Sequence, residues 1–397
     1  MARKCRKYPS TFKFAIMNIC LLTDGISPYV TGGMQRHSFN LCNELLKLGM
    51  EITLVHCVYG KATLPKSEEV KKLFEQPEKL TVHGLRFPAS SGMPGHYIKE
   101  SYEYSFAITE LLKSKLSSFD IIYTKGFSGW DLLQQRKKGK VKSGPVLVNF
   151  HGLEMFQEPA SFSERLKSYL LKSPVKWNLK QADYCISYGG KITKLIQNLG
   201  IPDSKIIVIP GAVNDNFILG KRNLPVNSKF LFVGRYERRK GIEELMKIVS
   251  SLPEIEISFV GSIPRSKKIK RDNVKYFGEV KDVLELNKIY DEHTFIVCPS
   301  HSEGLPNVLL EGMSRGLIPI ATRVGAVEEL VKEKYGFLID SKKEIELKAT
   351  LEKANSLDIS AKENLSKHAI ATIQNHFSWT QIANRTIENF QQVIEKH

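Results

Sequence analysis

The most informative pair of side chains in the sequence is Glu303 and Glu311, eight positions apart. They follow Phe295–Cys298, an apolar run typical of a buried strand, and the pattern from residue 307 onward is helical. Glu303 is therefore expected in a loop, and Glu311 about one turn into a helix. Carboxylates accept hydrogen bonds from sugar hydroxyl groups, and free N–H groups at a helix start can bind a phosphate. The pair could therefore hold two sugar rings with a phosphate between them, although the spacing alone favours two glutamates on an exposed helix.

Two cations, Arg235 and Lys240, follow a second apolar run, Phe230–Val233. Arg235 lies where the predicted strand ends, and Lys240 lies where the next predicted helix begins. An arginine fork and a lysine point charge placed in this way can converge on one diphosphate. The glycines that bracket the segment, Gly234 and Gly241, favour this interpretation over a basic surface loop.

Two further segments lie at the ends of predicted strands. Gly32 and Gly33 open a predicted helix, and paired glycines let the backbone approach an anion. His151 follows the predicted strand Val146–Phe150 and could contact a substrate. Each segment is weak evidence alone, because a simple turn and a structural histidine explain them as well.

The elements that must position these residues are short apolar strands that alternate with helices. The strands are predicted at Ile19–Thr23, Ile52–Val55, Thr81–Phe87, Ile121–Tyr123, Val146–Phe150, Tyr184–Ser187, Ile206–Ile209, Phe230–Val233, Ile257–Val260, Val274–Phe277, Phe295–Cys298, Ile318–Ala321 and Phe337–Ile339. The helices are predicted at Met34–Leu48, Glu103–Leu116, Phe162–Gln181, Ile192–Leu199, Gly241–Ser250, Val283–Tyr290, Asn307–Arg315 and Trp379–Ile394. This alternation predicts two doubly wound α/β domains with parallel sheets, joined near Gly211–Val226. Because open parallel sheets bind ligands at the carboxyl ends of their strands, the four segments share one geometric reason to lie together.

Composition sets the limits of this interpretation. The chain has 397 residues, of which 42% are apolar and 25% charged, which excludes a largely disordered protein. No run approaches about 18 consecutive apolar residues, so a spanning helix is excluded. The net charge of +16 is uneven: residues 1–200 carry 29 Lys and Arg against 16 Asp and Glu, whereas residues 201–397 carry 29 against 26. The excess of Lys and Arg in residues 1–200 predicts either an anionic partner or a solvated basic surface, with about equal weight.

The six cysteines are scattered, contain no Cys-x-x-Cys and lie mostly in strand-like segments. This pattern predicts reduced, buried thiols in a cytosolic protein. The basic residues before Phe14–Leu22 resemble a signal peptide only superficially, because no small-x-small cleavage site follows. A buried first strand is the better interpretation.

Together, the order and separation of these motifs resemble the retaining family 4 glycosyltransferases, also called group 1. The shared motifs are Gly32-Gly33 with His37, Gly234-Arg235 with Lys240-Gly241, the Glu303/Glu311 pair, and Phe377-Ser378-Trp379 before a last helix. The resemblance implies the GT-B fold, an α/β architecture in which two doubly wound Rossmann-like domains face a central cleft and the C-terminal helix crosses back to the first domain. It further implies an acceptor-side domain at 1–212, a donor-binding domain at 213–376 and a crossing helix at 377–397.

The resemblance also assigns the residues that act on a nucleotide-diphosphate sugar donor. Arg235 and Lys240 should hold the diphosphate and stabilise the charge of the leaving group. Glu311 should bind the ribose, Glu303 the transferred sugar, and His151 should lie near that sugar. The other implied positions bind the donor through the backbone or the pocket wall: Gly32, Gly33, Gly304, Leu305, Pro306, Asn307, Val308 and Gly325.

Retention of configuration without an enzymic nucleophile fits front-face attack, in which a leaving phosphate oxygen takes the proton of the acceptor. No cofactor is implied beyond the donor itself, and no Asp-x-Asp stands at a plausible metal site, so no metal is expected. Three departures from the family pattern, at Asn214, Gly312 and Ala326, affect the expected details of donor base and acceptor rather than the diphosphate and sugar ligands.

The expected function is transfer of a sugar to a glycan or lipid-linked acceptor, in the synthesis of cell-surface polysaccharide, lipopolysaccharide or glycolipid. The enzyme would be cytoplasmic and could dock on the anionic inner face of the membrane through its basic first domain. The candidate docking residues are Arg3–Lys7, Arg136–Lys140, Arg165, Lys167, Lys172 and Lys176. No nucleic-acid partner is expected, since no nucleic-acid-binding module is visible. The alternatives are a sugar-nucleotide 2-epimerase on the same fold and a non-catalytic scaffold that binds an anionic surface.

Overall fold

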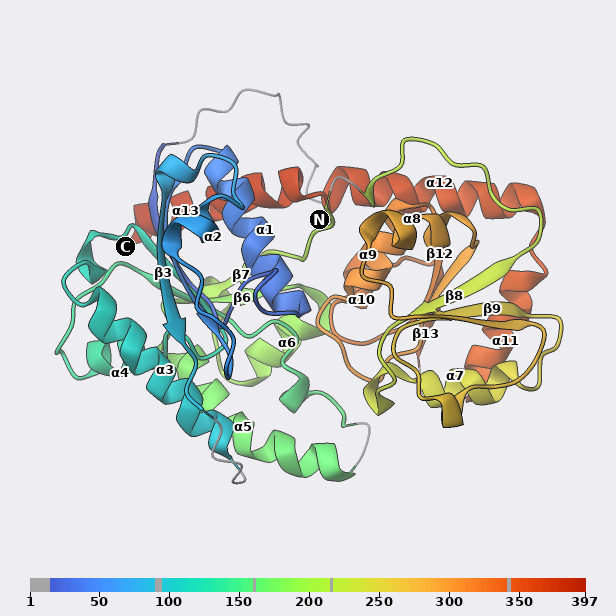
Figure 1. The fold of residues 1–397 in the computed structure, drawn as a ribbon, viewed down its shortest axis with the longest axis horizontal. Helices are drawn as coiled ribbons and strands as arrows, with labels where there is room; N and C mark the ends of the chain where they lie inside the picture. The colour runs from blue at the N-terminus through green and yellow to red at the C-terminus, as the bar shows by residue number, and fades with distance from the viewer. Residues whose placement is uncertain (1–14, 90–94, 160–161, 215–216, 341–343) are drawn as a thin grey trace.

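Two parallel sheets form two lobes that lie side by side (Figure 1). The computed structural model describes residues 15–89, 95–159, 162–214, 217–340 and 344–397. The first sheet has seven strands in the order β3-β2-β1-β4-β5-β6-β7, and the second has six in the order β10-β9-β8-β11-β12-β13. The strands are β1 (Asn18–Leu22), β2 (Glu51–Val58), β3 (Leu80–Arg86), β4 (Ile121–Lys125), β5 (Val146–Asn149), β6 (Tyr184–Ser187), β7 (Ile206–Val208), β8 (Lys229–Val233), β9 (Glu256–Val260), β10 (Val274–Gly278), β11 (Phe295–Cys298), β12 (Ile318–Thr322) and β13 (Phe337–Ile339). Each corresponds to a strand that the sequence predicted.

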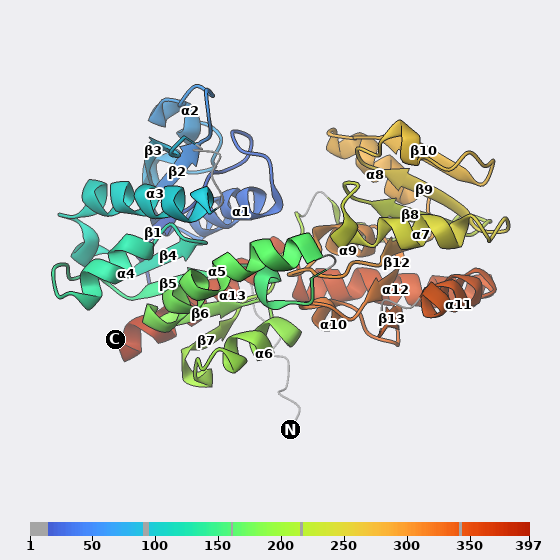
Figure 2. The ribbon, with the colours of Figure 1, turned by 90° about the horizontal axis from the view of Figure 1, so that it is seen from below.

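Helices cover both faces of each sheet (Figure 2). They are α1 (Gly33–Lys47), α2 (Ser67–Lys71), α3 (His96–Leu112), α4 (Trp130–Lys137), α5 (Phe162–Gln181), α6 (Gly190–Asn198), α7 (Ile242–Val249), α8 (Val283–Asp291), α9 (Asn307–Ser314), α10 (Val327–Leu330), α11 (Glu344–Asn355), α12 (Ile359–His376) and α13 (Trp379–Lys396). In the first lobe α1 packs beside α13, while α3, α4 and α5 pack together. In the second lobe α9 packs beside α12, and α7 beside α11.

The strand order reverses once in each sheet, between β1 and β4 and between β8 and β11. Such a reversal opens a crevice at the carboxyl ends of the two strands, because the flanking connections leave in opposite directions. In the second lobe, the loop that carries Arg235–Lys240 follows β8, and the loop that carries Glu303 follows β11. The topology therefore brings the two most informative motifs of that lobe to one crevice.

The central strands are buried along their whole length because both of their faces are covered. All four residues of β11 are buried, as are all five of β4 and β12. One apolar cluster continues through both lobes, and it includes Leu22 and Val148 of the first and Leu310 and Met313 of the second. The two lobes thus share packed apolar surface as well as covalent connections.

The chain passes between the lobes twice, and the two passages touch. The Val213 N–H donates to the Phe377 carbonyl at 2.9 Å, and the Trp379 N–H donates to the Val213 carbonyl at 3.3 Å. Helix α13 then runs back over the first lobe and buries Ile382, Ile387 and Phe390 there, as the long red helix of Figure 1 shows. The predicted crossing of the C-terminal helix is confirmed.

Five of the cysteines, at positions 20, 42, 57, 185 and 298, are buried and unpaired, as predicted. Cys5 lies outside the described residues, as does the basic segment Arg3–Lys7. Over the described parts of the chain, no helix combines the length and apolar character that crossing a bilayer requires.

Candidate active site

An ion pair between Lys240 and Glu303 forms the centre of the candidate site. Lys240 Nζ lies 2.6 Å from Glu303 Oε1, and the Ser300 hydroxyl donates to the same oxygen at 2.8 Å. The second carboxylate oxygen lies 3.8 Å from Arg239 Nη1. The Glu303 side chain is 9% exposed, so these positive groups stabilise a buried negative charge. The arrangement keeps a carboxylate and a cation together where strands β8 and β11 end.

Arg239, rather than Arg235, is the arginine beside this carboxylate. The Arg235 guanidinium pairs with Glu237 at 2.9 Å, and its side chain is 73% exposed. Arg239 also pairs with Glu237, at 2.9 Å. Sequence reasoning did not single out Arg239. The run Arg238-Arg239-Lys240 was the available signal, but side-chain directions at the end of a strand do not follow from spacing.

Glycines allow the loop that carries Glu303 to pack closely against its neighbours. Gly325 has φ +53°, and a Cβ placed there would lie 2.1 Å from the Glu303 carbonyl oxygen. A Cβ on Gly304 would lie 3.0 Å from Gly152 Cα of the first lobe. Any side chain at Gly325 would force the backbone of this loop to move.

Gln157, from the first lobe, links the two lobes at the same place. Its Nε2 donates to the Glu303 carbonyl and to the Gly152 carbonyl, both at 2.6 Å. Its Oε1 accepts from the Glu303 N–H at 3.4 Å. A glutamine in an irregular segment gives no sequence signal for such a contact, and this residue was missed.

The N-termini of α1 and α9 approach each other across the junction of the lobes. Gly32 precedes α1 and Pro306 precedes α9, and neither helix start has a side-chain cap. A Cβ on Gly33 would lie 3.3 Å from Asn307 Nδ2. Each helix start presents free N–H groups and the positive end of its dipole. Two such ends from different lobes make a place where an anion is stabilised from both sides.

The residues around the start of α9 differ in their exposure. Leu305 and Pro306 are buried, whereas Gly304, Asn307 and Val308 are half-buried. Side chains of the first two therefore fill the junction. The other three leave backbone groups within reach of a ligand.

Glu311 lines a cavity of about 210 Å³. Its Oε1 accepts from Arg36 Nη2 of the first lobe at 2.6 Å, and its Oε2 accepts from the Tyr290 hydroxyl at 3.0 Å. Asn307 lines the same cavity. Glu303 thus lies in the loop before α9 and Glu311 lies within α9, as the sequence predicted.

His151 lies in a buried polar cluster at the carboxyl ends of β4 and β5. Its φ is +57°, and its N–H donates to Asn149 Oδ1 at 2.7 Å. Its Nδ1 is hydrogen-bonded to the Tyr188 hydroxyl, and its ring meets the His37 ring edge-on with centroids 5.4 Å apart. Burial, which disfavours the charged imidazolium, holds the pKa of His151 well below its usual value and so favours the neutral imidazole.

Lys125 is a buried amine that sequence reasoning missed, because it stands at the end of an otherwise apolar strand. Its Nζ lies 3.1 Å from His37 Nδ1 and 3.2 Å from the Tyr123 hydroxyl. Burial lowers the pKa of Lys125 well below its usual value. Burial also raises the pKa of Asp24 to about 6, against opposing contributions from hydrogen bonds and from Lys125. The cluster thus contains several groups that are disposed to be uncharged.

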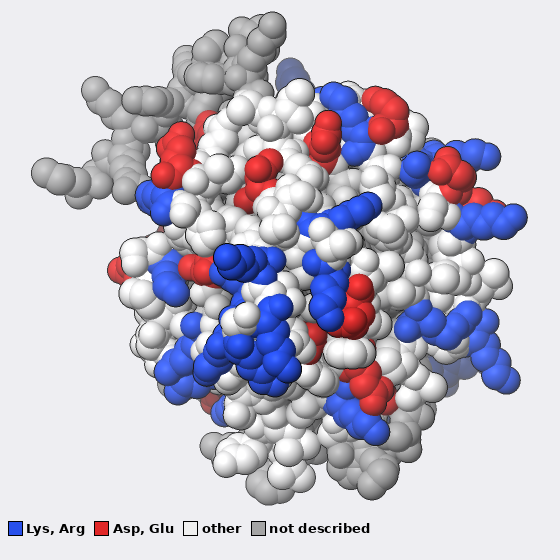
Figure 3. All heavy atoms as spheres, turned by 90° about the vertical axis from the view of Figure 1, so that its left-hand side faces the viewer, with Lys and Arg blue, Asp and Glu red and all other residues white. Residues whose placement is uncertain are grey.

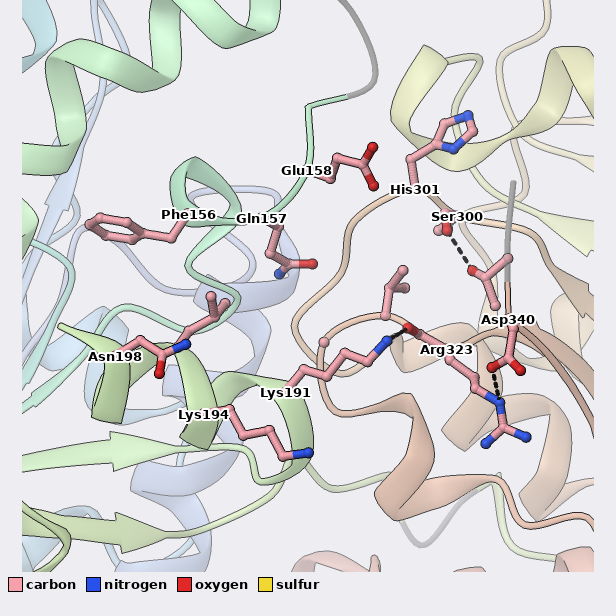
Figure 4. A pocket seen from close by; sticks show the side chains of 14 residues that line it. Phe156, Gln157, Glu158, Lys191, Lys194, Asn198, Ser300, His301, Arg323 and Asp340 are labelled. Atoms are coloured by element: carbon pink, nitrogen blue, oxygen red, sulfur yellow. Dashed lines mark hydrogen bonds and ion pairs between the residues drawn. The ribbon is translucent and has the colours of Figure 1, made fainter. Parts of the chain in front are cut away.

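The larger cavity, of about 740 Å³, lies between the lobes (Figure 4). Lys191 and Lys194 of α6 line one side, and Ser300 and Arg323 line the other. Gly325 belongs to this cavity rather than to the cavity at Glu311, and its carbonyl accepts from the Lys191 N–H at 2.9 Å. Because Ser300 also bonds Glu303, this cavity adjoins the central ion pair. No group of three or more His, Cys, Asp or Glu side chains within the described ranges is arranged to hold a metal ion.

Comparison with known proteins agrees with this architecture. The family "Glycosyltransferase Family 4" matches residues 31–217, and "Glycosyl transferases group 1" matches residues 227–355. The O-antigen biosynthesis glycosyltransferase WbnH of Escherichia coli is 29% identical over 163 residues, which are 40% of this chain and 46% of WbnH. The capsular polysaccharide biosynthesis glycosyltransferase CapM of Staphylococcus aureus is 27% identical over 179 residues, 42% of this chain and 43% of CapM. The chain thus aligns with less than half the length of these curated relatives.

Among solved structures, a sucrose-phosphate synthase from Thermosynechococcus elongatus superimposes with a TM-score of 0.76 at 21% identity, over 96% of this chain and all of that one. Anabaena HepE, solved with UDP and glucose, superimposes with a TM-score of 0.67 at 16% identity, over 95% of this chain and all of HepE. At these identities the structures establish a shared fold. The two matched regions together cover most of both lobes, in the order that the motifs predicted. The chain therefore belongs to the family 4, or group 1, glycosyltransferases and has their GT-B fold.

Proposed function

We propose that this protein is a retaining hexosyltransferase that moves a sugar from a nucleotide-diphosphate donor to a glycan or lipid-linked acceptor, in the synthesis of cell-surface polysaccharide or glycolipid. The names of WbnH and CapM, which belong to O-antigen and capsular polysaccharide synthesis, support this assignment. The single observation that supports this proposal most directly is the arrangement of groups where the two lobes meet. The Lys240–Glu303 pair lies beside two uncapped helix starts that face each other from different lobes.

In this proposal, the diphosphate of the donor binds between the starts of α1 and α9. The N–H groups beyond Gly32 and Gly33 approach it from one lobe, and those near Asn307 and Val308 approach it from the other. Lys240 supplies a half-buried cation. Arg235 supplies a second, mobile cation, because its exposed side chain can exchange Glu237 for a phosphate. Glu311 binds the ribose.

The transferred sugar binds at Glu303 and the backbone of Gly304, Leu305 and Pro306. His151, held neutral, lies on the opposite wall and can hydrogen-bond a sugar hydroxyl. Gly325 supports the loop that carries Glu303, because it packs against the Glu303 carbonyl. Packing and hydrogen bonds hold these sugar-binding groups in place, which is the condition for strong electrostatic stabilisation.

The mechanism in this proposal depends on stabilising the negative charge that develops on the leaving phosphate. As the bond between the anomeric carbon and the diphosphate oxygen breaks, negative charge grows on the phosphate, and the cations and helix starts stabilise it. The acceptor oxygen attacks from the same face and gives its proton to the leaving phosphate oxygen. Because lysine, arginine and backbone N–H groups can perform this stabilisation, we propose that the reaction needs no metal ion.

The same proposal divides the chain into an acceptor-side domain at 1–212, a donor-binding domain at 213–376 and a crossing helix at 377–397. The join near residue 213 is the first passage between the lobes, and Phe377 begins the second. This division supports separate binding of the two substrates.

We further propose that the enzyme docks on an anionic membrane surface through α5 and the adjoining end of the first lobe. Leu166, Tyr169 and Leu170 of α5 are 67%, 72% and 48% exposed, which is unusual for three neighbouring apolar side chains. Lys172 and Lys176 are exposed on the same helix. The side chains of Arg165 and Lys167 lie outside the described ones.

Basic side chains also gather on the end of the first lobe (Figure 3). Lys137, Lys138 and Lys140 are exposed there, where α4 ends. Lys137 Nζ lies 5.8 Å from the centre of the Trp177 ring of α5, so the basic end and the apolar helix adjoin. Apolar side chains that insert among headgroups, flanked by lysines that bind them, are the pattern of an interfacial helix.

The donor is tested by thermal shift and hydrolysis assays over a panel of UDP-, GDP-, ADP- and dTDP-sugars, in the presence and absence of EDTA. One nucleotide sugar should stabilise the protein and be hydrolysed slowly with or without EDTA. Glu303→Gln should retain the shift by the free nucleotide diphosphate but lose the extra shift by the sugar. Release of a free epimer without any acceptor would replace the proposal with the epimerase, and the absence of any shift across the panel would refute it.

A further inference from the structure

Arg36 makes an ion pair that crosses from one lobe to the other. It lies in the first turn of α1, and its Nη2 lies 2.6 Å from Glu311 Oε1 on α9. The Arg36 side chain is 45% exposed, whereas that of Glu311 is 7% exposed. The carboxylate is therefore fixed in its lobe, and the guanidinium is the partner that is free to move.

The two oxygens of Glu311 are held in different ways. Oε2 accepts from the Tyr290 hydroxyl at 3.0 Å, and Tyr290 is fully buried. Oε1 is held by Arg36, which lines the cavity of about 210 Å³ together with Glu311 and Asn307. A hydroxyl that enters this cavity therefore meets the oxygen that Arg36 occupies.

The size of the cavity indicates that something must move when a ligand enters. Sites for small molecules usually have roughly 300–1,000 Å³, and this cavity is smaller. Arg36 is the exposed group at its wall, and moving it would enlarge the cavity and free Oε1 at once. The proposed diphosphate site is close to Arg36, because α1 begins three residues earlier, at Gly33, beside the start of α9.

We propose that Arg36 is a donor-binding residue that exchanges partners: it pairs with Glu311 when the site is empty and with the donor diphosphate when the ribose takes its place on Glu311. This inference rests on the proposed function, in which Glu311 binds the ribose. A guanidinium matches the geometry of a phosphate as well as that of a carboxylate, so the same cation is paired in both states.

The exchange predicts opposite effects on two ligands that differ only in phosphate. For Arg36→Gln, a nucleoside no longer has to displace a cation, so its affinity should rise about threefold. The matched nucleoside diphosphate should bind roughly tenfold more weakly, because a charge-assisted hydrogen bond is lost. The probes are UDP, GDP, ADP and dTDP, and the nucleoside of whichever diphosphate binds the wild-type protein. Calorimetry measures the diphosphate, and ligand-observed NMR measures the nucleoside.

Arg265→Gln is the matched control, because Arg265 is exposed on the loop after β9 and is not among the described residues that line either cavity. It should change neither affinity. Arg36→Lys keeps the charge and should recover part of the diphosphate affinity. This comparison distinguishes the loss of the charge from misfolding of the Arg36→Gln protein. A parallel loss of both ligands in a folded Arg36→Gln protein, or no change in either, overturns the exchange while leaving the transferase assignment intact. If the wild-type protein binds none of the diphosphates, the proposed function fails, and the exchange fails with it.

Discussion

At the scale of single residues, the site depends on charges that are buried but paired. Removing one partner of such a pair leaves the other uncompensated, which costs more than the pair itself contributes. The buried Glu303 would be left in this position if the half-buried Lys240 were removed, since Ser300 and the more distant Arg239 are the other described polar side chains that contact the carboxylate. The chemistry and the local stability of the loop are therefore linked through one lysine.

Lys240→Ala should lower kcat for sugar transfer by ~10²–10³, because the proposed mechanism places this cation at the leaving phosphate. Single-turnover kinetics with the identified donor would measure this loss. Lys267→Ala, on the exposed loop after β9, should leave kcat unchanged and serves as the control. Full activity of Lys240→Ala would remove this lysine from the mechanism.

Asp24 should give the protein a measurable pH dependence of stability. Its pKa is raised from an ordinary value of 3.8 to about 6 by burial, so the folded state binds this proton more tightly than the unfolded state does. The contribution of Asp24 to stability is present below about pH 4 and is lost as the pH rises through about 6. Asp24→Asn should flatten the free energy of unfolding over this range in urea titrations. Asp203→Asn, at the exposed start of a short turn, is the control, and an unchanged slope in Asp24→Asn would contradict the assignment.

Residue types and spacing predicted which loops meet, but not every side chain within them. Glu303 and Lys240 follow neighbouring strands of one sheet, so their meeting could be expected from strand order alone. Arg239, Gln157 and Arg36 were missed because their contacts depend on rotamers and on how the lobes dock. Lys125 was missed for another reason: a lysine at the end of an apolar strand normally reaches solvent, and here a histidine and a tyrosine surround it.

At the scale of elements, the strands were predictable and some helices were not. Parallel strands covered on both faces are continuous apolar runs, such as Phe295–Cys298, and these are plain in the sequence. Helices α4, α11 and α12 were not predicted, because their apolar residues form a weak stripe among many polar ones. Tertiary packing rather than local pattern stabilises such helices.

The loop between β12 and α10 supports the loop of Glu303, and Gly325→Ala tests this support. An alanine at Gly325 is destabilised by the positive φ and also places its Cβ 2.1 Å from the Glu303 carbonyl oxygen. Gly139→Ala, at φ +67° with no atom within 4 Å, is destabilised by the backbone conformation alone. We expect Gly325→Ala to be less stable than Gly139→Ala by about 1–3 kcal/mol, measured by urea unfolding. Equal losses in the two variants would show that the contact is not tight.

At the scale of the whole molecule, charge and exposed apolar surface are divided between the lobes. Most of the net charge of +16 resides in the first half of the chain, where α5 also presents its apolar side chains. The second lobe has scattered exposed apolar residues instead, among them Val226, Leu284 and Ile345. This asymmetry predicts that one lobe faces a surface while the other remains in solution.

A variant with serine at Leu166, Tyr169 and Leu170 should bind vesicles of mixed phosphatidylglycerol and phosphatidylcholine about tenfold more weakly than the wild-type protein, measured by co-sedimentation. Binding by the wild-type protein should also fall as salt is raised, because the lysines contribute about 1 kcal/mol each near an anionic surface. Serine at Val226, Leu284 and Ile345 is the matched control for lost apolar exposure and should bind as the wild type does. Equal binding by all three proteins would place the membrane contact elsewhere.

The two passages between the lobes, hydrogen-bonded to each other at Val213, have a consequence for motion. A single connecting segment would let the lobes rotate freely about it. Two segments that are hydrogen-bonded to each other resist twisting of one lobe against the other but still permit bending. If the lobes open to exchange substrates, the paired passages should guide them back to the same alignment of opposing groups.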